Sequence, residues 1–265
     1  QNNLLAASAA AASAGGGGFY SYQIENSCRL DRDSNSYLRR TQGTPSSTTT
    51  FTWSMWLKRH GPIPASAQNR NFFITLGNSG SQYVFITFQT ANPYEDVLQQ
   101  DWQTGIGGAR TDARFRDTSA WNHFVFRYDS TQSTASDRYR WYHNGNLLTF
   151  QNQGSVSQDA SFPQIGSGNY IGHGYVSWTQ GADVYLADVH FCDGQSYAPT
   201  QFAESKNGVW IPKNPAGTTY GNNGYHLKFE NASDLGNDSS GNNNDLTTSG
   251  LGTDHQVADS PTFGD

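Results

Sequence analysis

Paired carboxylates are the first chemistry to look for in this sequence, because two carboxyl groups about 5–5.5 Å apart can hydrolyse a glycosidic bond. The motif E-x-D-x-x-E, which places such a pair in one cleft, does not occur. The glutamates are Glu25, Glu95, Glu204 and Glu230, and none belongs to that motif. In the segment DVYLAD, a regular strand would place Asp183 and Asp188 on opposite faces. The sequence therefore disfavours a glycoside hydrolase.

Other catalytic signatures are also missing from the sequence. It contains no G-x-S-x-G nucleophile elbow, no H-E-x-x-H zinc motif and no P-loop. The GIGG run at 105–108 matches only part of a dinucleotide fingerprint, since Arg110 stands at the last glycine position. We therefore expect a protein that is not an enzyme.

The histidines show no spacing typical of a metal site. Four of them lie within alternating strand patterns: His123, His143, His190 and His226. A histidine in such a pattern usually packs in the core or at its rim. We predict that role for each of the four, rather than metal ligation.

A loop rich in Asp, Asn, Ser and Gly occupies the second half of segment 224–244. Calcium binds about six to eight oxygen atoms, and the loop offers those of Asp234, Asp238 and Asn242. One structural Ca²⁺ is therefore a hypothesis, and no other cofactor is expected. The alternative is a network of Asx turns, in which the same side chains accept hydrogen bonds from backbone N–H groups. We favour this alternative because EF-hand spacing is absent.

Three aromatic residues fall in loops rather than in strand patterns: Trp102, Tyr175 and Trp178. Such rings can stack on the CH-rich face of a sugar, and they are also enriched at protein–protein interfaces. We take them as candidates for either contact and favour the protein interface. Trp53, Trp56 and Trp121 lie in or beside strand patterns and are predicted to be structural.

Short alternating segments recur along the chain. They are 51–58, 83–90, 122–128 and 183–192. In the first of them Phe51, Trp53, Met55 and Leu57 share one face. Asn144-Gly145 lies between two apolar arms, which predicts a type I′ hairpin.

The C-terminal part of the chain predicts two further features. A strand with Tyr225, Leu227 and Phe229 on one face and a return strand over 245–248 are expected to form a final hairpin that closes one sheet. Segment 198–205 is expected to form one or two helical turns, with Pro199 near the start. Many short strands separated by Gly, Asn and Ser turns favour an all-β antiparallel sandwich or jelly roll.

Bulk composition narrows the function further. The net charge of −6 makes nucleic acid a poor partner, and no apolar run approaches the roughly 20 residues that span a bilayer. Cys28 and Cys192 are far apart and form no CxxC motif. They could form one disulfide or remain two buried thiols, and we favour the thiols.

The first eighteen residues, QNNLLAASAAAASAGGGG, are low in complexity. A signal peptide is disfavoured, because no Lys or Arg precedes the apolar part and Leu4-Leu5 make a weak hydrophobic region. The segment is either a flexible leader or an arm that becomes ordered against a neighbouring protein, with Leu4 and Leu5 as anchoring residues. We favour the arm and divide the chain into this arm, 1–18, and one sandwich domain, 19–265.

Several segments, read in order, resemble a family of bacteriophage virion proteins that is common in marine phages. They are 37–59, 117–145, 182–204, 207–246 and 254–262, together with the leader NNLLAAS and the phrase IENS at 24–27. The resemblance covers nearly the whole chain. It implies a concanavalin A-like (laminin-G-like) antiparallel β-sandwich or jelly roll with an N-terminal low-complexity arm. Segments 62–71 and 90–114 depart from the family pattern, and a partner or glycan preference would lie in those loops.

Two functions follow as hypotheses. The first is a non-catalytic structural protein of the virion, either a capsid decoration or part of a head or tail fibre. Its partners would be other virion proteins and copies of itself, with a trimer as one option. The second is a receptor-binding adhesin that recognises host-surface polysaccharide.

Overall fold

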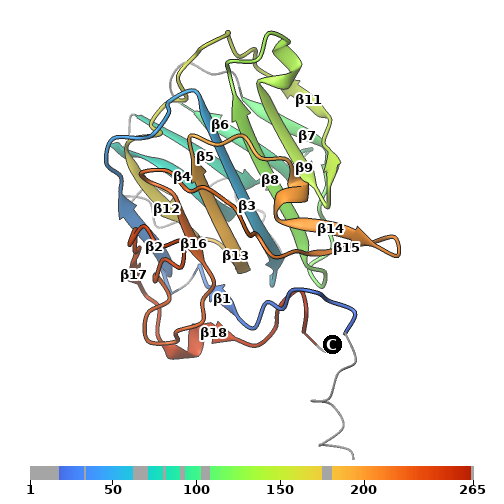
Figure 1. The fold of residues 1–265 in the computed structure, drawn as a ribbon, viewed down its shortest axis with the longest axis vertical. Helices are drawn as coiled ribbons and strands as arrows, with labels where there is room; N and C mark the ends of the chain where they lie inside the picture. Colours follow the sequence, from blue (N-terminus) through green and yellow to red (C-terminus); the bar gives the residue numbers. More distant parts are fainter. Residues whose placement is uncertain are drawn as a thin grey trace, which may run out of the picture.

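A computed structural model describes residues 18–32, 34–61, 71–79, 82–89, 93–102, 108–174 and 181–263. These residues form two antiparallel β-sheets, which pack face to face as the two layers of a sandwich (Figure 1). The predicted all-β antiparallel sandwich is confirmed. No helix within these ranges combines the length and the apolar character that crossing a membrane requires.

The two sheets have the following strand orders. Sheet A contains β10 (Asn146–Leu147), β9 (Tyr139–His143), β8 (Asn122–Asp129), β3 (Thr50–Arg59), β13 (Val184–Asp193), β1 (Ser27–Leu30) and β18 (Gln256–Val257), with β16 (Tyr225–Leu227) also paired to β13. Sheet B contains β11 (Phe150–Gln153), β7 (Ala109–Arg114), β6 (Val97–Trp102), β5 (Gln82–Phe88), β4 (Asn71–Ser79), β12 (Gly168–Ile171), β2 (Tyr37–Thr41) and β17 (Thr247–Ser249). A separate hairpin and three short 3-10 helices complete the described elements: β14 (Ala203–Lys206) with β15 (Val209–Pro212), η1 (Ala135–Asp137), η2 (Pro199–Gln201) and η3 (Thr253–His255).

The core lies between the two sheets and is rich in aromatic rings. The predicted alternation of β3 is confirmed, because its inner-face residues Phe51, Trp53, Met55 and Leu57 all belong to this core. Trp56 points to the opposite face, where it joins a smaller buried cluster. Burying each such aromatic side chain removes a large apolar area from water, and this burial is the main stabilisation of the sandwich.

The predicted type I′ turn is present between β9 and β10. Asn144 and Gly145 have φ values of +45° and +79°, and Asn146 pairs with His143. A Cβ atom on Gly145 would lie 2.7 Å from the ring of Trp210, so this glycine is required by close packing as well as by its backbone conformation.

The prediction of a final hairpin is wrong. β16 pairs with β13 in sheet A, whereas β17 pairs with β2 in sheet B. The intervening segment therefore crosses from one sheet to the other, and Leu235 and Leu246 from it are buried in the core. The segment between β16 and β17 thus connects the two sheets and packs against the core between them. It does not form a hairpin. The predicted helical turn is confirmed only at η2, after which the chain enters β14.

Strand β13 contains the irregularity that shapes the outer face of sheet A. Its pairing with β3 shifts between Ala187 and His190, and Asp188 has a φ of +48°. This β-bulge reverses the alternation along the strand. The expectation that Asp183 and Asp188 lie on opposite faces assumed a regular strand, and it is wrong for that reason.

Candidate functional site

The outer face of sheet A is covered by other parts of the chain. Ile24 from the N-terminal segment and Ala203 from β14 form a buried cluster with Trp56 and Ala187 of the sheet. Tyr22, Trp121 and Trp210 pack against this cluster. We call this covered face the outer layer. It is unusual because its buried part contains ionisable side chains as well as apolar ones.

The centre of the outer layer is an Asp–His–His cluster. Asp188 Oδ1 lies 2.6 Å from His226 Nε2, and Asp188 Oδ2 lies 3.1 Å from His190 Nε2. The two imidazole rings stack with their centroids 4.0 Å apart. All three side chains are at most 5 % exposed. The bulge of β13 and the pairing of β16 with its second half bring these residues together.

Two tyrosines hold the cluster from outside. Tyr22 Oη donates to Asp188 Oδ1 at 3.2 Å, and Tyr220 Oη lies 2.9 Å from His190 Nδ1. Burial lowers the pKa of His190 to about 4, so its imidazole is neutral at pH 7. Burial disfavours ionisation of Asp188, but the two histidines overcome this effect and hold its pKa below the usual value. The cluster therefore contains an ionised carboxylate facing imidazoles.

His123 also lies in the outer layer, and its hydrogen-bond partners define which ring nitrogen carries the proton. Trp210 Nε1, which can only donate, lies 3.1 Å from His123 Nδ1, so that nitrogen must accept. His123 Nε2 lies 2.8 Å from Ser54 Oγ and carries the proton of the neutral ring. Burial lowers the pKa of His123 to about 3. The predicted packing role is confirmed for this residue.

A second group of possible ligands lies at the edge of the outer layer. Asp31, His60 and Asp183 have ligand atoms within 4.8 Å of one another, and each is half-buried. Arg32 Nη2 forms an ion pair with Asp183 at 2.9 Å. Because a guanidinium already neutralises part of the charge, this group is a weaker candidate for a cation.

In the 234–244 loop, Asp238 and Asn242, two of the three predicted calcium ligands, form hydrogen bonds within the protein. Asp238 Oδ1 accepts from the backbone N–H groups of His226 and Ser240, and Oδ2 accepts from Ser240 Oγ and the N–H of Asn244. Asn242 donates its amide to the carbonyls of Gly221 and Gly224, whereas Asp234 is exposed. The contacts of Asp238 are those of an Asx-turn network, which favours that alternative over calcium.

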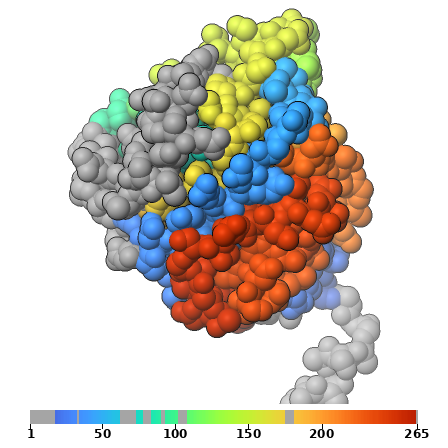
Figure 2. Space-filling model, turned by 90° about the vertical axis from the view of Figure 1, so that its left-hand side faces the viewer, coloured from blue at the N-terminus to red at the C-terminus, as the bar shows by residue number. Residues whose placement is uncertain are grey.

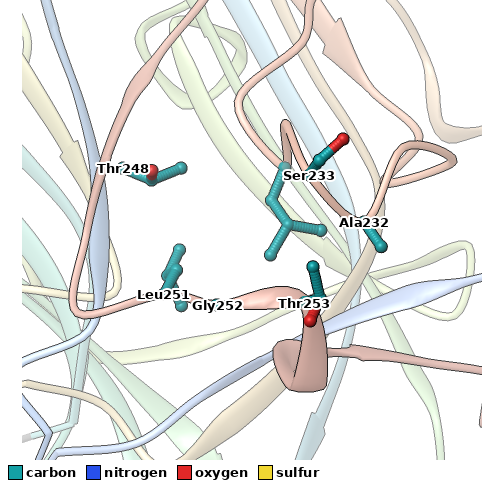
Figure 3. Close-up of a pocket in the computed structure, with 7 residues that line it drawn as sticks. Ala232, Ser233, Thr248, Leu251, Gly252 and Thr253 are labelled. Carbon is teal, nitrogen blue, oxygen red and sulfur yellow. The ribbon is translucent and has the colours of Figure 1, made fainter.

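Two concavities lie near this loop. An open groove of about 510 Å³ is lined by Arg39, Arg40, Thr41, Asn243, Asp245 and Thr247. Its residues come from β2 and from the C-terminal segment, and Figure 2 shows the corresponding N-terminal (blue) and C-terminal (red) parts meeting on one face. A smaller pocket of about 200 Å³ lies between the 232–235 turn and residues 248–253, with Thr248 and Leu251 facing Ser233 and Ala232 across it (Figure 3).

The other predicted site residues are placed as follows. The prediction that Trp102 lies in a loop is wrong, because segment 90–114 contains β6 and β7 and Trp102 ends β6, where its backbone pairs with Val84. Its side chain lies outside the described part of the structure. Tyr175, Trp178, Leu4 and Leu5 also lie outside the described residues. Their roles as glycan, partner or anchoring residues remain predictions. Cys28 and Cys192 are both buried free thiols.

Sequence spacing did not reveal the Asp–His–His cluster. His190 and His226 pack as predicted, but they belong to strands that pair only in the folded sheet. Asp188 joins them because of a bulge that the alternation pattern did not predict. The only signal in the sequence was an aspartate in the middle of a largely apolar strand, since such a residue must find partners when buried.

Comparisons with known proteins do not identify a family for this chain. No protein-family model and no curated protein matches the chain. Among solved structures, a native heptameric SAP-like pentraxin from Limulus polyphemus is 13 % identical over 67 % of this chain and 80 % of its own, with a TM-score of 0.43. The Trypanosoma rangeli sialidase is 14 % identical over 58 % of this chain and 22 % of its own, with a TM-score of 0.41.

A third similar structure is the CBM40 of the Ruminococcus gnavus IT-sialidase, bound to α2,3-sialyllactose. It is 14 % identical over 58 % of this chain and 80 % of its own, with a TM-score of 0.38. Similarities this distant carry no functional argument. The function proposed below rests on the residues of this chain.

The loop hydrogen bonds predict the effect of removing Asp238. Asp238→Ala leaves three backbone N–H groups and the Ser240 hydroxyl without their acceptor, and we expect the free energy of unfolding to fall by about 2–4 kcal/mol. The exposed Asp234→Ala change should stay within about 0.5 kcal/mol. Urea unfolding measures both, with millimolar Ca²⁺ or EDTA added. A Ca²⁺-dependent stability that disappears in Asp238→Ala would instead identify a calcium site.

The protonation state of His123 predicts a dependence of stability on pH. The folded protein keeps His123 neutral well below pH 6.5, whereas the unfolded chain binds a proton there, so the stability that this residue confers is full above pH 6.5 and is lost as pH falls. Between pH 7 and pH 5 the wild type should lose about 2 kcal/mol more than His123→Gln. Unfolding in urea at the two pH values measures this difference. Equal losses would show that His123 is already protonated in the folded state.

Proposed function

We propose that this chain is a non-catalytic structural protein of a bacteriophage particle. In this proposal residues 1–18 attach the chain to other virion proteins, and the sandwich is presented at the particle surface as a capsid decoration or as part of a fibre. The resemblance of the sequence to phage virion proteins supports the proposal, and two features of the structure agree with it.

The observation that carries the proposal is the meeting of the first and last described segments at one end of the sandwich (Figure 1). The N–H of Ile24 donates to Thr262 Oγ1 at 3.0 Å, and Thr262 Oγ1 donates back to the carbonyl of Ile24 at 3.1 Å. Phe263 beside them is 71 % exposed and offers an apolar ring to a neighbouring protein. An attachment site at this end would leave the opposite end and both flanks of the sandwich exposed.

The buried carboxylates support a non-catalytic role. Within the described residues the buried acids are Asp129, Asp188, Asp193 and Asp238. Asp193 accepts from the N–H groups of Ser46 and Asn223. Asp129 accepts from the side chains of Thr131 and Gln132. These hydrogen bonds hold turns in place, whereas a hydrolytic pair would have to face substrate.

Removing residues 1–18 tests the attachment. We expect the full chain, tagged and expressed during infection, to band with purified particles, and the truncated chain to be at least about tenfold depleted from them because the anchoring arm is absent. Phe263→Ser should weaken incorporation, since it removes an exposed apolar contact, while the matched change Leu147→Ser, at a residue that is 53 % exposed, should not.

Thermal unfolding of each purified variant provides the control for folding. A folded truncated chain that loads as well as the full chain would contradict the attachment role of residues 1–18. Release of reducing ends from host polysaccharide by the purified chain would contradict the non-catalytic role.

The groove between β2 and the C-terminal segment favours a second candidate function, an adhesin for host polysaccharide. All of its lining side chains are polar, and Arg39 and Arg40 contribute two cationic groups. Guanidinium groups bind carboxylates in a bidentate manner, and the Asn, Asp and Thr side chains can bind sugar hydroxyls. This chemistry fits an acidic saccharide better than a neutral one.

A glycan array tests the adhesin. We expect binding to acidic glycans that Arg39→Ala reduces by about tenfold or more, because a charge-assisted pair is lost. Arg116 is also exposed and lies outside the groove, so the control variant Arg116→Ala should bind as the wild type does. Trp102→Ala and Trp178→Ala examine the aromatic candidates in the same experiment. Silence across the array with folded protein would exclude this function.

A further inference from the structure

Two buried polar atoms of the Asp–His–His cluster lack a hydrogen-bond partner. Asp188 Oδ2 and His190 Nε2 face each other at 3.1 Å, yet neither has a hydrogen-bond partner among the described residues. The only ion-pair partners that the described residues give to Asp188 are the imidazoles of His190 and His226. A buried carboxylate is costly unless its oxygens are paired. Oδ1 is paired with His226 and Tyr22, whereas Oδ2 is not. A cation between Asp188 Oδ2 and His190 Nε2 would satisfy both atoms.

The orientation of His190 identifies which atom lacks a partner. When His190 Nδ1 donates to Tyr220 Oη, its Nε2 presents a lone pair to the Asp188 carboxylate. Two acceptors then face each other, which is the arrangement that a metal ion between them stabilises. Histidines that bind metals usually donate their other ring nitrogen in this way, and carboxylate ligands are usually hydrogen-bonded as Asp188 is by Tyr22.

We propose that Asp188, His190 and His226 bind a divalent transition-metal ion of the Zn²⁺ class. Two imidazoles and one carboxylate suit zinc and its neighbours rather than calcium or magnesium. A divalent ion would offset the charge of the carboxylate and satisfy the two unpaired acceptors.

The distances are compatible with this ligand set. Zinc–ligand bonds of about 2.0–2.1 Å in a tetrahedral site place ligand atoms about 3.3 Å apart. The Asp188 Oδ2 to His190 Nε2 distance of 3.1 Å is close to this value. The Asp188 Oδ1 to His226 Nε2 distance of 2.6 Å must open by about 0.7 Å. Rotation of the carboxylate and a turn of one of the two stacked imidazole rings, whose planes lie 24° apart, are both required for the three side chains to face one ion.

The ion would act on the N-terminal segment as well as on the sheet. Tyr22 donates to the carboxylate that holds the ion, and Ile24 packs in the same layer. A metal ion would thus link β13, β16 and segment 19–24, which leads from the proposed attachment arm into the sandwich. This inference does not depend on the proposed function, because the ligands lie within the sandwich itself.

Native mass spectrometry of the full chain tests the proposal. Because the ligands are buried, the chain is unfolded with EDTA and refolded with or without equimolar Zn²⁺. We expect about one Zn²⁺ per chain and a thermal midpoint raised by about 5 °C or more. His226→Gln should retain less than about a tenth of the metal. His123→Gln, a buried histidine of the same layer outside the cluster, should bind as the wild type does, as should His60→Gln of the second ligand group.

X-ray absorption of the Co²⁺-loaded wild type keeps the test independent of how the variants fold. Two imidazoles and one carboxylate around cobalt are the expected result, whereas the second group can supply only one imidazole. Wild-type protein without bound metal, metal retained by His226→Gln, or metal lost in His60→Gln would overturn the proposal. A cluster that binds only protons is the alternative that the first of these results would establish.

Discussion

The bulge in β13 is the constraint on which the rest of this sandwich depends. It divides a central strand of sheet A into two halves, and each half pairs with a different segment at the same edge. Val184–Leu186 pairs with β1, and Val189–Phe191 pairs with β16. N-terminal and C-terminal parts of the chain thus join the sheet side by side. The positive φ of Asp188 costs on the order of 1–3 kcal/mol and persists because both flanking pairings fix it.

The bulge also determines the character of the outer layer. Before it, the outer-facing residues of β13 are Tyr185 and the small apolar Ala187, and after it they are Asp188 and His190. The same strand therefore supplies an apolar surface for Ile24 and a polar surface for Tyr22 and Tyr220. Segment 19–24 and the β14–β15 hairpin cover the apolar part, and Tyr22 and Tyr220 cover the polar part. The sandwich therefore has a partial third layer, which consists of the N-terminal segment and this hairpin.

The sequence predicted the parts of the fold that depend on local pattern. The inner face of β3 and the Asn144-Gly145 turn were predicted because alternation and turn chemistry act within a few residues. The final hairpin was predicted wrongly, since apolar alternation does not indicate which sheet a strand joins. The Asp–His–His cluster was missed because residues 188 and 226 meet only through non-local pairing. The loop around Asp238 was recognised, and its hydrogen bonds favour the Asx-turn alternative over calcium.

These features describe a sandwich whose first and last described segments meet at one end and whose buried acids are held by hydrogen bonds and histidines. That organisation suits a module that is attached at one end and displayed at the other. Cryo-electron microscopy of the intact phage particle tests this account most directly. It predicts density for the sandwich at the particle surface, with Ile24 and Thr262 directed towards the particle body. Particles without this density, or with that end directed into solvent, would contradict it.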